Sequence, residues 1–232
     1  MKKNILIIGG SSGIGLASVK ALKDDYNLYV ASRSQHPLED LGVHHITHDV
    51  MGDPLDTSSL PETLNGMVYC PGTINLRPFK GLKPEVFLDD FQINVLGAVK
   101  SLQAVLNRLQ KGEAPSSVVF FSTVAVQTGM PFHSSVATAK GALEGLSRSL
   151  AAELAPKVRC NTIAPSLIDT PLAEKFLSND AKKSNAAARH PLQRFGQPDD
   201  IAKMTRFLLS DDSSWITAQT ITVDGGIGSI KN

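Results

Sequence analysis

Short apolar runs alternate along this chain with longer stretches whose apolar residues recur at helical spacing. The apolar runs lie at residues 5–9, 27–32, 43–47, 67–70, 117–122, 158–163 and 219–223, and helices are predicted at 14–23, 91–110, 134–155 and 198–209. The runs lack strict alternation of apolar and polar residues, which is typical of strands covered on both faces. The pattern therefore predicts an α/β fold, a doubly wound seven-stranded parallel sheet flanked by helices.

The connections between these elements indicate one domain over residues 1–232. No repeat, low-complexity tract or linker rich in Pro, Gly and Ser divides the chain. Residues 34–42 are too few for a full crossover helix, so about one helical turn is predicted there. Residues 167–197 form the longest stretch without a clear pattern, and long loops in compact domains are usually functional lids or disordered segments.

The composition favours a small-molecule partner. Hydrophobic residues make up 42% and charged residues 19% of the 232 residues, and a net charge of +1 provides no field for nucleic acid or an anionic membrane. Cys70 and Cys160 lie far apart, which suggests neither a disulfide nor a cysteine metal site. The first apolar run is too short for a signal peptide or a membrane span, so a cytoplasmic location is expected. His44 and His48 should point away from His45, so no metal site is expected.

The segment "IIGGSSGIG" joins the first predicted strand to the first predicted helix. Gly9 permits the sharp turn, Gly13 lets the backbone approach a pyrophosphate, and Gly15 allows the helix to pack on the sheet. Ser11 and Ser12 can cap the helix, whose N-terminal amides attract an anion. Although the spacing is GxxxGxG and a ligand-free turn is the alternative, the context favours a dinucleotide site and hence a Rossmann domain.

The end of the second predicted strand indicates which dinucleotide binds. Ser32 stands where an NAD-preferring fold places an acidic residue, and Arg33 follows it. A guanidinium suits a 2′-phosphate, so this segment favours NADP(H) over NAD(H). An exposed arginine beside a loop is the alternative.

Several long sequence motifs occur along the chain in the same order as in a known protein family. They are "GGSSGIG", "HDV", "INVLGAV", "AKGALEGLSRSLAAELAP", "PLQRFGQPDDIAKMTRFLLSD" and "ITVDGG". With them the chain resembles the short-chain dehydrogenase/reductase family, most closely its 3-oxoacyl-ACP reductase-like branch. The resemblance implies an NADP(H)-dependent oxidoreductase that reduces a carbonyl (3-oxoacyl-type) or conjugated acyl substrate.

The resemblance also implies which residues form the site. The family's Asn, catalytic Ser, Tyr and Lys correspond to Asn94, Thr123, Val136 and Lys140. In the family the Tyr supplies the proton, while the Lys binds the nicotinamide ribose and lowers the pKa of the Tyr. The remaining residues implied to contact the cofactor are Ile14, Asp49, Val50, Pro71, Gly72, Pro165 and Thr170. Here the family's Asn-Asn-Ala-Gly turn reads "YCPG", and its Pro-Gly reads Pro165-Ser166.

The missing tyrosine leaves the proton source open. His133 stands seven residues before Lys140, where the enoyl-ACP reductase branch has its Tyr, and the two would share a face if the helix has begun. Thr123 or a relayed water is a further possibility, and a histidine without a role is the alternative. The rival function is an impaired cofactor-binding protein, acting as a sensor or as the silent subunit of a hetero-oligomer.

Family members commonly assemble into tetramers through helices that correspond here to 91–110 and 134–155. Both carry small residues suited to close packing: Gly97, Ala98, Ala104, Ala142, Gly145, Ala151 and Ala152. A homotetramer with two-fold symmetry is therefore expected.

Overall fold

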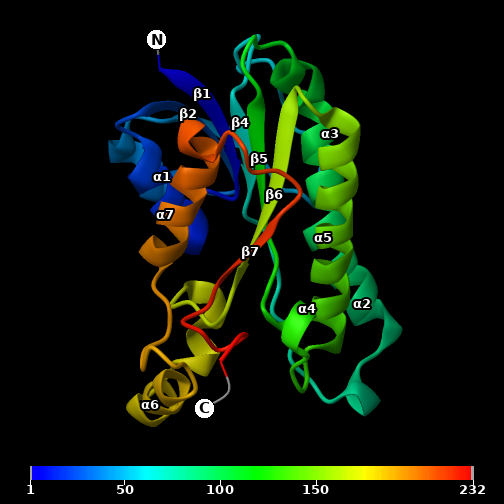
Figure 1. Cartoon of the computed structure of the whole chain (residues 1–232), viewed down its shortest axis with the longest axis vertical. Helices are drawn as coiled ribbons and strands as arrows, with labels where there is room; N and C mark the ends of the chain where they lie inside the picture. The colour runs from blue at the N-terminus through cyan, green and yellow to red at the C-terminus, as the bar shows by residue number, and fades with distance from the viewer. Residues whose placement is uncertain (1, 231–232) are drawn as a thin grey trace.

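A computed structural model describes residues 2–230. Seven parallel strands form one sheet in the order β3-β2-β1-β4-β5-β6-β7, which confirms the predicted doubly wound architecture (Figure 1). The strands are β1 (Lys3–Ile8), β2 (Tyr26–Ser32), β3 (His44–Thr47), β4 (Gly66–Tyr69), β5 (Ser116–Phe121), β6 (Val158–Pro165) and β7 (Thr220–Val223).

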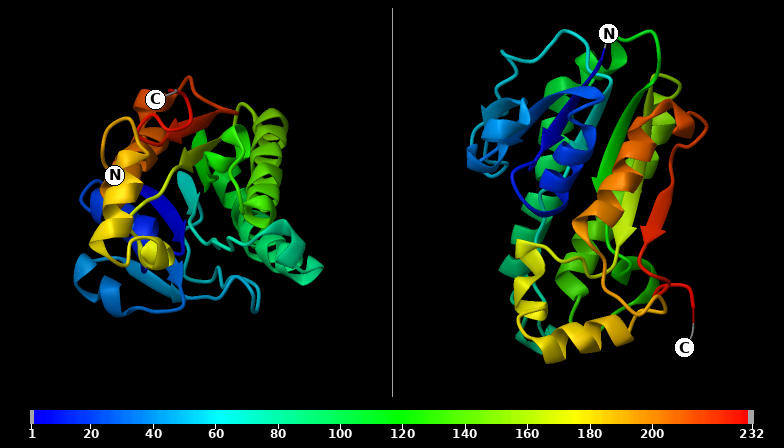
Figure 2. Two further views of the ribbon diagram at one scale, coloured as in Figure 1. Left: turned by 90° about the horizontal axis from the view of Figure 1, so that it is seen from below. Right: turned by 90° about the vertical axis from the view of Figure 1, so that its left-hand side faces the viewer.

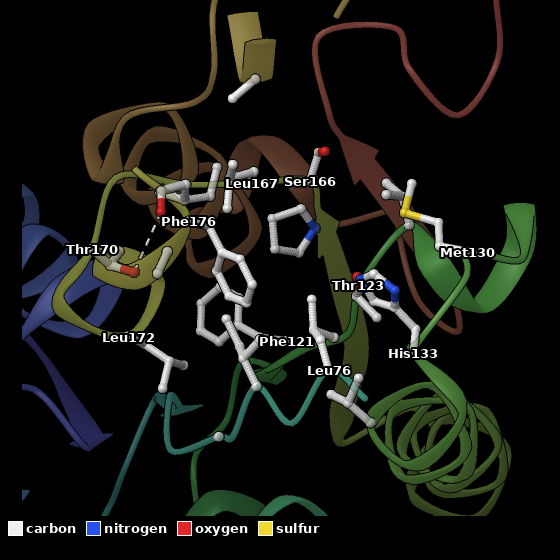
Figure 3. A pocket seen from close by; sticks show the side chains of 18 of the residues that line it. Leu76, Phe121, Thr123, Met130, His133, Ser166, Leu167, Thr170, Leu172 and Phe176 are labelled. Carbon is white, nitrogen blue, oxygen red and sulfur yellow. Dashed lines mark hydrogen bonds between the residues drawn. The ribbon is translucent and has the colours of Figure 1, made fainter. Parts of the chain in front are cut away.

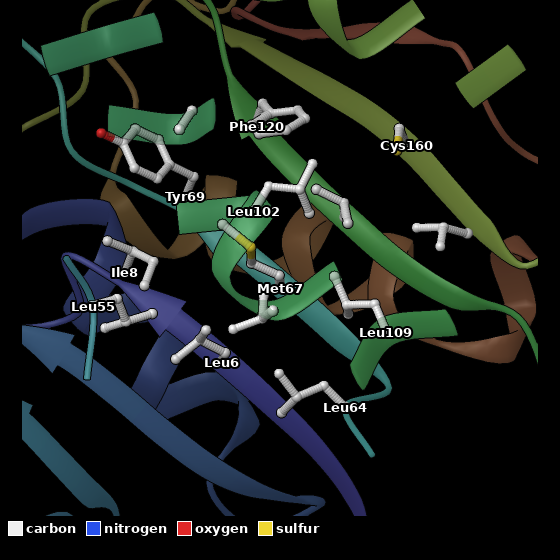
Figure 4. Close-up of a cluster of buried hydrophobic side chains, with 14 of the residues drawn as sticks. Leu6, Ile8, Leu55, Leu64, Met67, Tyr69, Leu102, Leu109, Phe120 and Cys160 are labelled. Atoms are coloured by element: carbon white, nitrogen blue, oxygen red, sulfur yellow. The ribbon is translucent and has the colours of Figure 1, made fainter. Parts of the chain in front are cut away.

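Successive side chains of each inner strand enter opposite faces of the sheet, because a strand alternates with a period of two. On β1, Leu6 and Ile8 pack into one apolar cluster while Ile5 and Ile7 pack into the other. Figure 4 shows the first cluster, where Leu6, Phe120 and Leu102 gather from different elements. Burial on both faces explains why these strands appear in the sequence as unbroken apolar runs.

Helices cover both faces of this sheet (Figures 1 and 2). Helices α1 (Gly13–Leu22) and α7 (Pro198–Leu209) pack together on one face, and α3 (Gly97–Gln110) and α5 (Ser134–Leu154) lie on the other. The shorter helices are α2 (Pro84–Phe91), α4 (Ala125–Thr128) and α6 (Asp180–Ala188). The predicted helix 198–209 is confirmed with its bounds.

The predicted single helix 91–110 is wrong in its start and in its regularity. Helix α2 runs into a π-helical turn, Gln92–Leu96, which continues as α3. Asn94 lies inside this turn, where its Nδ2 donates to the Asp90 carbonyl at 2.7 Å. The Tyr69 hydroxyl donates to the Ile93 carbonyl at 2.6 Å. These two bonds satisfy carbonyls at a turn that regular helical periodicity does not reveal.

Two predicted connections have different outcomes. A 3₁₀ helix at His36–Leu41 confirms the abbreviated crossover. The expectation of an irregular stretch over 167–197 is wrong, because a 3₁₀ helix at Pro171–Phe176 and helix α6 lie within it. Only Ala186 of α6 is buried, so this helix carries no apolar stripe in its sequence.

Three of the small residues predicted for an oligomer interface are buried within the chain, so that part of the prediction is corrected. They are Gly97, Ala98 and Ala151. A Cβ at Gly97 would lie 2.1 Å from the Tyr69 hydroxyl, so this glycine is required by packing inside the chain. Ala104, Gly145 and Ala152 are exposed on α3 and α5. Within residues 2–230, none of the helices is both long and apolar enough to cross a membrane.

Candidate active site

The glycine-rich loop between β1 and α1 adopts the shape that a phosphate site needs. Gly9 and Gly13 have positive φ values of 79° and 51°. A Cβ at Gly15 would lie 2.1 Å from the Gly9 carbonyl oxygen, so only glycine fits there. Ser12 occupies the N-cap position, but its side chain makes no capping bond, which corrects the predicted serine cap. Ser12 is exposed and leaves the first amides of α1 without a side-chain cap, and such amides at a helix N-terminus attract an anion.

Loops that follow β4 and β6 meet this glycine loop at the carboxyl edge of the sheet. A Cβ at Gly9 would lie 3.0 Å from Pro71 Cδ, and one at Gly13 would lie 3.2 Å from Thr170 Cγ2. Pro71 and Thr170, predicted from the resemblance to contact the cofactor, thus flank the glycine loop. This edge is where ligands bind in open parallel sheets.

The segments after β2 and β3 lie beside this loop. Arg33 is exposed, while the buried Ser32 hydroxyl bonds to the Ser34 carbonyl and to His45 Nε2 at 3.0 and 3.1 Å. The Asp49 carboxylate accepts from the Met51 amide at 3.0 Å, and Val50 packs against the apolar core. Since Ser32 is engaged within the chain, Arg33 is the side chain free to meet a ribose substituent.

Lys140 and Asn94 converge next to Gly72. A Cβ at Gly72 would lie 3.1 Å from Asn94 Oδ1 and 3.2 Å from Lys140 Nζ, so a side chain there would crowd both polar groups. Asn94 Oδ1 is buried and accepts no hydrogen bond within the described residues. An orphaned oxygen beside an ammonium is the arrangement that a hydroxyl or a water completes.

A buried carboxylate lies behind these two residues. The Thr73 hydroxyl and Asn75 Nδ2 both donate to Asp90 Oδ1, the latter at 2.7 Å. Asn94 Nδ2 donates to Thr73 Oγ1 at 2.9 Å. Asp90 is fully buried, and its Oδ2 has no hydrogen-bond partner in residues 2–230. The predicted helix 91–110 excluded Asp90, although its position one turn before Asn94 was a signal that could have been used.

Burial dominates the electrostatics of Lys140, which is only 8% exposed. It lowers the pKa of the ammonium to about 8, and the nearby Cys70 and Asp90 oppose the shift. Burial also raises the pKa of the Cys70 thiol to about 12, which keeps it protonated at neutral pH. Lys140 is thus a poorly solvated cation with Asp90 nearby, and it belongs to no salt bridge among the described residues.

A cavity of about 730 Å³ opens in front of Lys140. Thr123, His133, Val136 and Lys140 all line it, as do the predicted cofactor residues Ile14, Gly72, Pro165 and Thr170. Figure 3 shows apolar side chains, among them Leu76, Phe121 and Phe176, around the same space. Of the polar residues that line the cavity, the sequence predicted Thr123, His133, Lys140 and Thr170, but it predicted neither the remaining polar residues nor the apolar wall.

His133 lines the cavity from the position that precedes α5, and not from within the helix as its predicted spacing to Lys140 requires. Helix α5 begins at Ser134, so His133 is the residue before the helix and not part of its face. Its Nδ1 lies 2.7 Å from the Pro131 carbonyl, which can only accept, so Nδ1 carries the proton of that bond. The shared helical face proposed for His133 and Lys140 is therefore wrong, although both line the cavity.

The segment after β6 covers the cavity. Lys175 Nζ donates to the Ile74 carbonyl at 3.2 Å, which joins this segment to the loop after β4. A second contact that the sequence did not predict links Ser166 to the buried His190, whose Nε2 lies 2.9 Å from the serine hydroxyl. The position of Ser166 was identified as a departure from Pro-Gly, but nothing in the sequence pairs it with His190. Among the described residues, no group of three or more His, Cys, Asp or Glu side chains could hold a metal ion.

Comparison with known proteins identifies the family. The sequence model of a family described as enoyl-(acyl carrier protein) reductase matches residues 56–228. L-xylulose reductase of Bos taurus is 32% identical over 237 residues, which cover 97% of this chain and 96% of that protein. The chain belongs to the short-chain dehydrogenase/reductase family. It is thus a short-chain dehydrogenase/reductase-type NAD(P)-dependent oxidoreductase by descent.

Two solved structures share the fold of this chain. Ligand-free aldohexose dehydrogenase of Thermoplasma acidophilum superposes with a TM-score of 0.90 at 26% identity, covering 100% of this chain and 97% of that one. The protein ElxO, solved with NADP bound, gives a TM-score of 0.88 at 26% identity, covering 99% of this chain and 100% of that one.

The residues of this chain fit a dinucleotide. Gly9, Gly13 and Gly15 shape a loop that a backbone-bound pyrophosphate requires, and this loop leads directly into the N-terminus of α1. Lys140 lines the cavity and offers a donor to a ribose hydroxyl, while the orphaned Asn94 Oδ1 lies buried beside Gly72.

Proposed function

We propose that this protein is an NADP(H)-dependent reductase of the 3-oxoacyl-ACP reductase-like branch, acting on a carbonyl (3-oxoacyl-type) or conjugated acyl substrate. The observation that carries the proposal is the position of Lys140, which lies between the dinucleotide loops and an apolar cavity. When bound, the cofactor would supply hydride to a carbon held in that cavity.

The chain's own residues have distinct roles in this proposal. Arg33 binds the 2′-phosphate, the amides of α1 bind the pyrophosphate, and Lys140 binds the nicotinamide ribose. Thr123 holds the substrate oxygen, because it follows β5 and lines the cavity. Val136, which lines the same cavity, provides no proton, so the proton must come from another group.

The cavity supports an acyl substrate. Its wall is largely apolar, and Lys175, Lys182 and Arg189 line its outer side. Lys182 and Arg189 belong to exposed stretches of α6 and the residue after it. Apolar carbons beside the dinucleotide loops, with cations at the rim, suit an acyl chain that continues into an anionic carrier. The enoyl-(acyl carrier protein) reductase description of the matching family is consistent with this substrate class.

A second candidate function is that of an impaired cofactor-binding protein, a sensor or a silent subunit. The valine at position 136, where the family has its Tyr, favours it. Hydride transfer nevertheless depends largely on positioning, and loss of a general acid typically costs about 10² to 10⁴ in rate without abolishing the reaction.

Titration with NADPH and NADH tests the cofactor assignment. Charge-assisted contacts are worth about 1.5 to 3 kcal/mol, and the exposure of Arg33 favours the lower end, so NADPH should bind roughly tenfold tighter. Arg33→Ala should remove that preference and leave NADH affinity unchanged, whereas Arg33→Lys should retain part of it. Equal affinities in the wild type would exclude the NADP assignment. NADPH oxidation with a 3-oxoacyl and an enoyl thioester then separates the two candidate functions.

A further inference from the structure

The cavity holds few groups that can give up a proton. In the reduction of a carbonyl, the substrate oxygen must gain one proton for each hydride that the carbonyl carbon receives. A threonine hydroxyl is too weak an acid to release a proton unaided, and Val136 has none. His133 is partly exposed and its Nδ1 donates to the Pro131 carbonyl, so Nε2 of the neutral ring is an acceptor and not a donor. Ser166 bonds to His190 Nε2, and His190 Nδ1 lies 2.7 Å from the Ala186 carbonyl.

Lys140 differs from these groups in position and in contacts. It lines the cavity one helical turn after Val136, on the same helix face, so the small valine leaves the space in front of the ammonium open. In residues 2–230 its Nζ belongs to no salt bridge. Behind it, Asn94 Oδ1 and Asp90 Oδ2 are buried acceptors without partners.

We propose that the Lys140 ammonium is itself the proton donor, delivering its proton from Nζ to the substrate oxygen that the Thr123 hydroxyl holds. This proposal rests on the proposed reductase function. An ammonium has three N–H groups, enough for Asn94 Oδ1, a ribose hydroxyl and the substrate oxygen together. In the reduction direction an N–H bond of Lys140 breaks and an O–H bond of the product alcohol forms. The neutral amine then regains its proton from solvent.

The surroundings of Lys140 support this role. Cys70 after β4 and Asp90 on α2 are the titratable groups that act on Lys140. His133 lines the same cavity, and Glu144 lies one turn later on α5. Glu144 accepts a hydrogen bond from the Ser122 hydroxyl, so its carboxyl is engaged elsewhere. Burial lowers the pKa of Lys140 to about 8, which lies close to working pH, where a general acid is most effective.

Lys140→Arg separates proton donation from ribose binding. Arginine keeps the positive charge and the hydrogen bonds but cannot be deprotonated in a protein. NADPH affinity, measured by fluorescence, should stay within about threefold of the wild type. Hydride transfer to an acetoacetyl thioester at saturating NADPH should fall by about 10² to 10⁴. The matched control is Lys100→Arg on the exposed side of α3, which should change neither quantity.

Rescue of Lys140→Ala by an added amine provides the second test and does not depend on how arginine packs. Methylammonium should raise the rate of hydride transfer at saturating NADPH in proportion to its concentration. Tetramethylammonium carries the same charge but has no N–H proton to donate, so it should give no rescue.

Full activity of Lys140→Arg, or equal rescue of Lys140→Ala by methylammonium and tetramethylammonium, would overturn the proton-donor role while leaving the reductase function intact. A wild type that binds NADPH but reduces neither thioester would instead refute the reductase function, and the donor role with it.

Discussion

The stability of the cofactor-free protein should depend on the charge of Lys140. The pKa of this ammonium falls from its ordinary 10.5 to about 8 because burial disfavours the charged form. Between these two pH values the unfolded chain binds a proton that the folded chain does not, so the free energy of unfolding rises with pH. Each pH unit is worth 1.36 kcal/mol, so the contribution of Lys140 rises by about 3 kcal/mol over the interval.

The assay compares wild type with Lys140→Met by urea unfolding without cofactor, from pH 7.5 to pH 10.5. Other groups that titrate in this range, such as Tyr26, are present in both proteins and largely cancel in the difference. The wild type should gain about 3 kcal/mol relative to Lys140→Met between pH 8 and pH 10.5. Lys100→Met, at an exposed position on α3, is the matched control and should show no such rise.

A difference that stays flat within about 1 kcal/mol over this range would refute the reasoning, because burial would then not be what perturbs Lys140. A difference that falls with rising pH would have the wrong sign. It would mean that a closely paired carboxylate stabilises the ammonium, in which case Asp90 and not burial controls the site.

Two further predictions concern position 136 and assembly. Val136→Tyr places a phenol one turn before Lys140. If Lys140 already donates the proton, the rate of thioester reduction should change by less than about threefold. A gain in rate of about 10² or more would instead favour the impaired-protein candidate. We also propose a homotetramer built through α3 and α5, for which light scattering should show four chains. Gly145→Arg should lower the fraction of tetramer, because a Cβ at this exposed glycine meets no atom of its own chain within 4 Å and the arginine would therefore enter the interface. A wild-type monomer at micromolar concentration, or an intact tetramer of Gly145→Arg, would contradict that interface.

The fold was predictable from sequence because burial on both faces of a parallel sheet leaves a clear apolar signal. Each strand lies within two residues of its prediction, and α7 has its predicted bounds. The π-helical turn was not predictable, since Asn94 fits an ordinary helical pattern until its contacts with Asp90 are known. Helix α6 was missed for the opposite reason, because almost all of its side chains are exposed.

The candidate site, like the fold, has one part that the sequence predicts and another that it does not. The glycine loop has a local signal, since positive φ and close approach require glycine at fixed positions. The carboxylate behind Lys140 has a weaker signal, the spacing of one turn between Asp90 and Asn94, because its contact with Thr73 forms only in the folded chain. His133 shows the limit of spacing arguments: seven residues equal two turns only where the chain is helical, and α5 starts one residue too late.

The free-energy cost of burying the Lys140 ammonium is itself an argument about function. Holding a lysine at 8% exposure without a close ion pair disfavours its charged form, and a methionine would fill the same space without that cost. Gly72 adds to the case, because a side chain there would crowd both Lys140 Nζ and Asn94 Oδ1. A chain in which Lys140 had no partner to bind would have no physical reason to keep a buried cation beside an orphaned acceptor. Both features disfavour the cofactor-free protein, and a ribose hydroxyl or a substrate oxygen in front of the ammonium would offset that cost.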